Sequence, residues 1–392
     1  MQAISNVAVI GAGAMGSALA ALLADRGLGV TLLDLDRSAA ATAIARQQKR
    51  GNLSSPGSVA RITVGTVESD LSLLACADWI IEAAAEDLAV KQAIFAAVNK
   101  NRKRGSIVSS STSTIRLAQL VDDMAKDDAR DYLVTHFFNP PQAMKLLEVV
   151  AGPRTRSSAL KSISRVASDR LDRTVLHCRD TPGFIANRIG NFWMAVALDE
   201  AVSRGIAVEE ADAILGKPFG TPGGIFGLLD YVGIELLPVG WGSLQRALPD
   251  SDPLQRYAAK PPLIAMMIEA GTIGRKTGAG FRRKADDGRM QVLDIASRQY
   301  RDERAVSAET VCGGDADAKA IIRHPGTCGE FARAVWGEVF RYASALIPEI
   351  ADGPDQIDLA MREGYGWREG PFELIGRIGE IPPTPQKSEH EL

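Results

Sequence analysis

The sequence predicts an α/β domain with a doubly wound parallel sheet, followed by a duplicated all-α domain. Three observations lead to this prediction. Short β-branched runs alternate with Ala- and Leu-rich stretches over residues 1–180, strand-like runs nearly disappear after Asp180, and a pattern of glycines and aromatic residues recurs in the C-terminal half. Short, continuous apolar runs are typical of parallel strands that are buried on both faces.

The strand and helix signals of the first domain follow one another in the order that such a sheet requires. Strand-like runs at 6–10 and 30–33 lie on either side of a helical stretch at 15–26, and further runs follow at 79–82, 106–109 and 132–138. Alternation of this kind predicts helices on both faces of a mostly parallel sheet.

Composition narrows the class of protein. A chain of 392 residues fits two or three domains, and 46% hydrophobic with 24% charged residues is typical of soluble globular proteins. The net charge of −3 excludes a bulk basic surface for nucleic acid. No stretch reaches the ~20 apolar residues that span a bilayer, and the N-terminus lacks the basic segment of a signal peptide. We expect a cytoplasmic protein that neither binds nucleic acid nor inserts into membranes.

The cysteines give no sign of a disulfide scaffold. Cys76, Cys178, Cys312 and Cys328 lie far apart without a CxxC pair, and the chain has only four histidines. A zinc module is therefore not expected either, no metal site is predicted, and a reducing compartment is the natural interpretation.

A glycine-rich turn predicts a site for a dinucleotide. Gly11, Gly13 and Gly16 form a G-x-G-x-x-G motif that follows the first strand and opens an Ala/Leu-rich helix, with Met15 inside the motif. In a Rossmann-type domain, the first glycine permits the tight turn, the second lets the backbone approach a pyrophosphate, and the third allows close packing of helix on sheet. The helix N-terminus supplies free N–H groups.

Asp34, at the end of the second strand, predicts which dinucleotide binds. A carboxylate at this position accepts hydrogen bonds from the adenosine ribose diol and repels a 2′-phosphate. NAD is therefore favoured over NADP, although Arg37 lies nearby.

His136 and Glu148 form the candidate catalytic pair. His136 lies near the end of the run 132–138, the sequence Asn139-Pro140-Pro141 breaks this run, and 145–150 is the next strand. If the chain doubles back, the two side chains lie on neighbouring strands. Oxidation of an alcohol needs a proton acceptor with a pKa near neutrality, and a buried carboxylate would orient and stabilise the imidazole. A structural histidine at a strand end is the alternative.

A run of hydroxyl side chains, residues 109–114, follows the strand at 106–109. It lies where an open α/β sheet forms its ligand crevice, at the carboxyl end of a strand. These hydroxyls could bind a substrate oxygen or a nicotinamide, or they could only cap a loop or helix.

The helical half contains an internal repeat. With Asp212 aligned to Asp358, one ungapped offset of 146 residues pairs Phe219 with Tyr365, Gly220 with Gly366, Gly224 with Gly370, Phe226 with Phe372, Leu228 with Leu374 and Gly233 with Gly379. An exposed apolar helical face needs a cover, and a second copy supplies one within the chain. We expect the copies, near 183–285 and 325–380, to pack as a pseudo-two-fold pair and the chain to be monomeric.

The predicted domains are a dinucleotide-binding domain at 1–182, a first helical domain at 183–290, a second helical repeat at 291–380 and a linker-like tail at 381–392. The polar stretch around 283–325 has no clear pattern of its own.

Together these motifs resemble the L-3-hydroxyacyl-CoA dehydrogenases of fatty-acid β-oxidation. The most specific segments are Thr135-His136-Phe137-Phe138-Asn139-Pro140 and Asp180-Thr181-Pro182-Gly183-Phe184-Ile185-Ala186-Asn187-Arg188. The duplicated helical half is similar to the dehydrogenase portion of multifunctional β-oxidation enzymes, in which an enoyl-CoA hydratase domain is fused to it. No hydratase segment is visible in this sequence. The resemblance therefore implies an enoyl-CoA hydratase domain as a possible fused or associated partner.

The resemblance implies a role for each site residue. His136 would be the general base and Glu148 its orienting partner. Ser113 would touch the substrate oxygen and the nicotinamide, and Asn187 the substrate carbonyl region. Three further residues would contact the nicotinamide side of NAD: Asn139 beside the ring, and Glu86 and Lys91 at its ribose. The second copy has Arg333 at the position equivalent to Asn187, so it would carry no catalytic site.

The implied reaction is oxidation of an L-3-hydroxyacyl-CoA to the 3-oxoacyl-CoA with NAD⁺. Many relatives have Asn where this sequence has Ser111, so the loop before Ser113 differs. By position alone, Lys49, Arg50 and Arg61 are candidates for the CoA phosphates. The alternatives are a related NAD-dependent dehydrogenase of a small hydroxy acid or carnitine, and a non-catalytic structural relative.

Overall fold

The computed structural model describes residues 3–257, 261–314 and 316–382, so the predicted tail lies outside the described residues from 383 onward. The chain forms two compact units, Met1–Phe184 and Ile185–Leu392.

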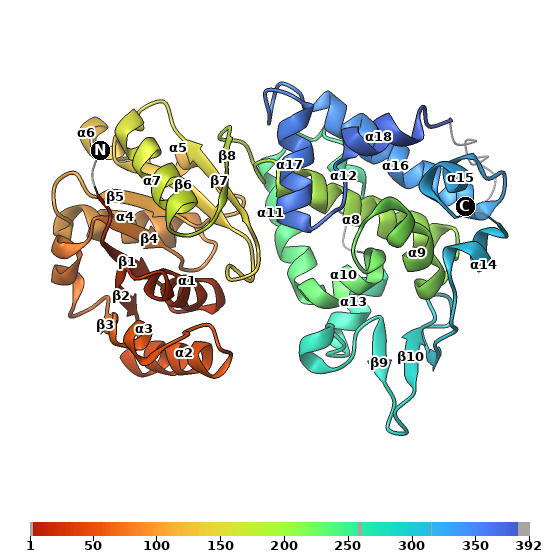
Figure 1. Cartoon of the computed structure of the whole chain (residues 1–392), viewed down its shortest axis with the longest axis horizontal. Helices are drawn as coiled ribbons and strands as arrows, with labels where there is room; N and C mark the ends of the chain where they lie inside the picture. The colour runs from red at the N-terminus through yellow and green to blue at the C-terminus, as the bar shows by residue number, and fades with distance from the viewer. Residues whose placement is uncertain (1–2, 258–260, 315, 383–392) are drawn as a thin grey trace. The chain divides into compact units, whose positions relative to one another are not determined.

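The first unit is a doubly wound α/β domain (Figure 1). Its strands are β1 (Asn6–Ile10), β2 (Gly29–Asp34), β3 (Ile62–Thr66), β4 (Trp79–Glu82), β5 (Ile107–Ser110), β6 (Tyr132–Phe137), β7 (Leu146–Ala151) and β8 (Thr174–Cys178). Its helices are α1 (Ala14–Asp25), α2 (Arg37–Lys49), α3 (Pro56–Ala60), η1 (Leu71–Cys76), α4 (Leu88–Asn101), α5 (Leu117–Leu120), α6 (Lys126–Ala129) and α7 (Ser157–Asp169).

The eight strands form one sheet in the order β3-β2-β1-β4-β5-β6-β7-β8. Only β7 runs antiparallel to its neighbour β6, and the other pairs are parallel. The chain leaves β1 toward β2 and later continues on the other side of β1 with β4, which is the topological switch point of a dinucleotide-binding sheet. The predicted fold class of this half is confirmed, and β3 and β8 are strands that the sequence analysis did not identify.

The second unit is mainly helical. Its helices are α8 (Ala186–Ser203), α9 (Val208–Leu215), η2 (Lys217–Phe219), α10 (Gly224–Val232), η3 (Ile234–Leu236), α11 (Leu237–Ala247), α12 (Leu254–Tyr257), α13 (Pro262–Glu269), η4 (Arg275–Thr277), α14 (Ala308–Cys312), α15 (Ala318–Arg323), α16 (Thr327–Ala345), α17 (Pro354–Tyr365) and α18 (Pro371–Ile378). Among the described residues, no single helix is long and apolar enough to cross a membrane. The bent pair Gly224–Val232 and Ile234–Ala247 reaches that length and composition only when its two helices are taken together.

Two equivalent aspartates show that the repeat is structural. Asp212 accepts hydrogen bonds from the backbone N–H groups of Phe226 (2.7 Å) and Gly227 (3.1 Å) at the start of α10. Asp358 accepts them from Phe372 (2.9 Å) and Glu373 (3.1 Å) at the start of α18. Burial raises the pKa of both carboxyl groups to about 6, even though these hydrogen bonds act in the opposite direction.

The two copies pack on each other reciprocally. Phe219 of the first copy stacks on Trp336 of the second, with ring centroids 5.2 Å apart. In the equivalent pair, Tyr365 of the second copy lies against Gly190 of the first. Because the Phe219–Trp336 contact has a counterpart at the offset of 146, the two copies meet in the manner of an isologous pair. The predicted packing of the copies is confirmed.

The polar stretch around 283–325, which has no clear pattern of its own in the sequence, contains most of a small sheet. Strands β9 (Arg282–Lys284), β10 (Met290–Leu293) and β11 (Tyr300–Asp302) form a small antiparallel sheet in the order β11-β10-β9. Figure 1 labels β9 and β10 of this sheet. Strands of three or four residues are too short to give a period-2 signal. β10 spans the predicted domain boundary between residues 290 and 291.

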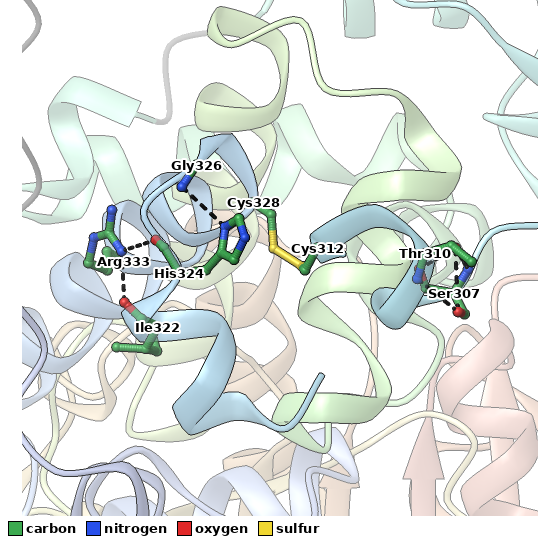
Figure 2. The surroundings of a disulfide bond; sticks show 8 residues. All are labelled: Ser307, Thr310, Cys312, Ile322, His324, Gly326, Cys328 and Arg333. Atoms are coloured by element: carbon green, nitrogen blue, oxygen red, sulfur yellow. Dashed lines mark hydrogen bonds between the residues drawn. A yellow bond between two sulfur atoms is a disulfide. The ribbon is translucent and has the colours of Figure 1, made fainter. Parts of the chain in front are cut away.

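Two of the four cysteines are paired, although their spacing in the sequence gave no sign of a disulfide scaffold. Cys312 at the end of α14 and Cys328 in α16 form a disulfide, with Cα atoms 5.7 Å apart (Figure 2). The segment between them folds back through α15, which brings together cysteines 16 residues apart. Cys76 and Cys178 are free thiols.

Glu209 ties α9 to the small sheet, and we predict that it makes stability depend on pH. Its buried carboxylate binds Arg301 at 2.7 Å and Arg304 at 3.0 Å. Burial alone would raise the pKa of Glu209, but the hydrogen bonds from Arg301 and Arg304 outweigh it and lower the pKa to about 2. A lowered pKa stabilises the fold above about pH 4.5, and this contribution disappears as the pH falls toward 2.

Glu209→Gln should therefore lower the free energy of unfolding by about 2–3 kcal/mol at pH 7. The measurement is urea unfolding of both proteins at pH 7, 5 and 3.5, where the difference should shrink at the lowest pH. A difference that stays constant over this range would contradict the assignment.

Candidate functional site

The sheet brings the predicted site residues of the first unit to one edge. The parallel strands β1, β4, β5 and β6 end there, and they are followed by the glycine turn, Glu82–Glu86, the Ser/Thr run and His136–Asn139. Ligands of open α/β sheets bind at this carboxyl edge.

The glycine turn leaves room for a phosphate. Gly11 has φ +104°, and a Cβ there would lie 2.5 Å from the Ala83 carbonyl oxygen. A Cβ at Gly16 would lie 1.8 Å from the carbonyl oxygen of Gly11, so both positions require glycine. At Gly13, the residue before α1, an added Cβ would meet nothing within 4 Å. The N-terminus of α1 therefore faces open space, which fits the pyrophosphate of NAD.

Asp34 ends β2 next to this turn. Its carboxylate accepts hydrogen bonds from the backbone N–H groups of Ala12 and Leu35. The Arg37 guanidinium is bound by the Asp70 carboxylate at 2.6 Å and the Val64 carbonyl at 2.7 Å. Arg37 is thus held by other groups, and Asp34 remains the charge beside the glycine turn.

His136 and Glu148 lie opposite each other in the antiparallel pair β6–β7. The imidazole Nδ1 is 2.7 Å from Glu148 Oε2. His136 is 5% exposed and Glu148 is fully buried. Because a carboxylate accepts hydrogen bonds, Nδ1 carries the proton, and the lone pair of the imidazole is on Nε2.

Apolar neighbours surround the imidazole. The ring centroids of Phe138 and Phe184 lie 4.5 Å and 5.6 Å from that of His136. A residue that the sequence analysis missed, Cys178 of β8, lies near Glu148; burial first, and then the Glu148 carboxylate, raises the pKa of its thiol. Only the β7–β8 register brings Cys178 close, so no local motif could have identified it.

The Ser/Thr run has two parts with different surroundings. Ser109 and Ser110 are fully buried and belong to the core. Ser113 is partly exposed, and its backbone N–H donates to Glu86 at 3.1 Å. Glu86 also accepts from Thr112 Oγ1 (2.5 Å) and Thr114 Oγ1 (3.0 Å), so one carboxylate shapes the loop that carries Ser113.

A buried ion pair lies beneath this loop. The Lys91 ammonium, 1% exposed, is 2.9 Å from Glu82 and 3.3 Å from Glu86. Burial raises the pKa of Glu86, but Lys91 and the loop hydrogen bonds outweigh it, so the pKa is lowered. Glu82, which the sequence analysis did not select, also accepts from Ser110 at 2.5 Å. Its signal in the sequence was a carboxylate at a strand end.

The structure also shows on which elements the remaining predicted residues lie. Asn139 is exposed just after β6, and Asn187 lies in the first turn of α8, in the second unit. Lys49, Arg50 and Arg61 are exposed at the ends of α2 and α3. Among the residues that the structure describes, no cluster of His, Cys, Asp and Glu could hold a metal ion.

A dinucleotide-binding sheet with a buried His–Glu pair at its carboxyl edge is typical of NAD-dependent dehydrogenases. Comparison with known proteins assigns the family. Residues 6–181 match the family described as "3-hydroxyacyl-CoA dehydrogenase, NAD binding domain", and residues 183–284 match its "C-terminal domain". The chain belongs to the 3-hydroxyacyl-CoA dehydrogenase family, and its first unit is the NAD-binding domain.

Similar proteins agree with this assignment. A probable 3-hydroxyacyl-CoA dehydrogenase of Bacillus subtilis is 35% identical, over 96% of this chain and 51% of that protein. A putative fatty acid oxidation complex trifunctional enzyme of Rickettsia felis is 32% identical, over 95% of this chain and 53% of that protein. The chain thus spans about half the length of these curated relatives. The fold is also that of 3-hydroxybutyryl-CoA dehydrogenase from Escherichia coli, with a TM-score of 0.73 and 23% sequence identity. This match covers 96% of this chain and 92% of the other.

Asp34 should determine the choice of dinucleotide. Asp34→Ala should weaken NADH binding about 10-fold, because hydrogen bonds from the ribose to a charged acceptor are lost, and should reduce the preference over NADPH. The measurement is quenching of protein fluorescence by each dinucleotide. Glu68→Ala, which removes another negative charge from the same unit, is the control. Equal affinity of the wild-type protein for NADH and NADPH would contradict the assignment.

Proposed function

We propose that this chain oxidises L-3-hydroxyacyl-CoA to 3-oxoacyl-CoA with NAD⁺, as a step of fatty-acid β-oxidation. The observation that carries the proposal is the His136–Glu148 pair, which provides an oriented base at the edge of an NAD-binding sheet. The names of the relatives support the substrate class, since those relatives are hydroxyacyl-CoA dehydrogenases and a fatty acid oxidation enzyme.

In the proposed mechanism, His136 Nε2 accepts the proton of the 3-hydroxyl group. Glu148 stabilises the resulting imidazolium through Nδ1. Bound NAD⁺ would supply the acceptor for the hydride that leaves carbon 3. Ser113 contacts the substrate oxygen and the nicotinamide, and Asn187 contacts the substrate carbonyl region.

Further residues hold the cofactor in this proposal. Asn139 would hold the nicotinamide, Glu86 and Lys91 its ribose side, and Asp34 the adenosine ribose. Gly11, Gly13, Met15 and Gly16 would hold the pyrophosphate. The direct test of the function is oxidation of NADH with 3-oxoacyl-CoA substrates of graded chain length, compared with free 3-oxo acids. Turnover of the free acids alone would overturn the proposal.

His136→Gln should keep the fold and NADH affinity but lower kcat by ~10²–10⁴-fold, because general-base catalysis contributes about this much. Glu148→Gln should lower kcat as well, because the imidazolium loses its counter-charge. The matched control is His177→Gln, which replaces an exposed histidine of β8. Steady-state kinetics and thermal melting distinguish loss of chemistry from loss of fold. Near-normal turnover of His136→Gln would refute the mechanism.

We further propose that the dehydrogenase unit is a monomer that works with a fused or associated enoyl-CoA hydratase. The name of the trifunctional relative supports fusion with further domains. The reciprocal packing of the two helical copies supports the monomer, because it would occupy the surface that an isologous dimer uses.

Light scattering should give a mass near 41.8 kDa for this chain. Deleting the residues after 305 should produce dimers or aggregates, because the apolar face of the first copy loses its cover. A tight dimer of the intact chain held through the helices of residues 183–285 would contradict the proposal.

A further inference from the structure

The second helical copy reaches the residue that the proposed function assigns to the substrate. Tyr365, the last residue of α17, donates a hydrogen bond from its hydroxyl to Asn187 Oδ1 at 3.2 Å. Its ring lies directly on the first turn of α8. A Cβ at Gly190 would lie 2.0 Å from the Tyr365 Cζ and 2.4 Å from its hydroxyl oxygen. Tyr365 can therefore approach Asn187 only because residue 190 is glycine.

The equivalent contact in the other direction lacks each of these features. Phe219 occupies the position of Tyr365 and has no hydroxyl, and Trp336 stands where α8 has Gly190. The two aromatic rings stack with an interplanar angle of 22°. The contact between these two side chains is one of stacked rings, without a hydrogen bond between them in the stack.

Arg333 replaces Asn187 in the second copy, and it has a structural role. Its guanidinium donates to the carbonyl oxygens of Ile322 at 2.8 Å and His324 at 2.7 Å (Figure 2). Arg333 is only 8% exposed. The tyrosine hydroxyl, the asparagine and the glycine thus occur together in one half of the interface, and all three are replaced in the other.

We propose that Tyr365 is a positioning residue for the reaction, acting through Asn187. A primary amide has one acceptor and one donor end, and nothing in its shape distinguishes them. A hydroxyl that donates to Oδ1 fixes the orientation of the Asn187 amide. Oδ1 then faces Tyr365, and Nδ2 is the end that meets a substrate carbonyl oxygen. The backbone carbonyl of Asn187 also accepts from Asn191 Nδ2 at 2.8 Å, which holds the start of α8.

This inference rests on the proposed function and makes it more specific. The second copy then has two functions: it covers the first copy, and it contributes a group that orients a substrate-binding side chain. The site is incomplete without α17.

The test is a double-mutant cycle with acetoacetyl-CoA as the probe. Tyr365→Phe removes only the hydroxyl and should lower kcat/KM by about 3–10-fold, the usual effect of losing one hydrogen bond. The dissociation constant of NADH, which binds the first unit, should not change. In an Asn187→Ala background, which itself lowers kcat/KM, Tyr365→Phe should have no further effect, because the group it orients is gone.

Two further variants keep the interpretation unambiguous. Asn187→Asp keeps an acceptor for Tyr365 but has no N–H donor, so it should lower kcat/KM at least as much as Asn187→Ala while the melting temperature remains close to that of the wild type. Tyr300→Phe removes another tyrosine hydroxyl of this unit, one that donates to the Gly280 carbonyl at 2.5 Å, and should leave kcat/KM unchanged.

Wild-type kcat/KM in Tyr365→Phe, or an equal loss with and without Asn187, would overturn the inference, because a merely structural effect is additive. These results leave the proposed function intact. If the wild-type protein binds NADH but does not turn over acetoacetyl-CoA or any longer 3-oxoacyl-CoA, the proposed function itself fails and the inference fails with it.

Discussion

The architecture of the second unit depends on the need to bury α8. This helix is apolar on nearly all sides: twelve of its eighteen residues are buried, including Phe192, Trp193 and Met194. A helix of this kind is stable only inside a protein. One helical copy cannot surround it, and α16 and α17 of the second copy complete its cover. The duplication is therefore a solution to a burial problem that the first copy creates.

A buried charge gives the same interface its specificity. The guanidinium of Arg188, 1% exposed, is bound by Asp252 of the first copy at 2.6 Å, and the hydroxyl of Tyr342 from the second copy completes the group. Tyr342 also donates to Asp252 at 3.0 Å. Removing one member of such a group leaves another buried without its partner, at a cost of about 3–5 kcal/mol. The two copies must therefore meet in one register, the one that brings Tyr365 to Asn187.

The sequence predicted those parts of the molecule whose signals are local or periodic. The glycine turn, the alternation of strands and helices in the first unit and the offset of 146 residues each depend on spacing along the chain. The His136–Glu148 contact was also predictable, since a break followed by a second strand implies an antiparallel pair. Contacts set by tertiary packing were not predictable. Cys178 reaches Glu148 only through the β7–β8 register, and Cys312 meets Cys328 only because α15 folds back.

Fusion of two copies also removes a constraint that symmetry imposes. In a dimer of identical subunits, residue 190 and its counterpart would both be glycine, and both facing aromatic residues would be the same. Within one chain the two halves can differ, and here they do. Trp336 and Phe219 fill their half of the interface with apolar contact, while Gly190 and Tyr365 leave room for a hydroxyl at Asn187. One half is thus specialised for stability, and the other can serve the chemistry of the site.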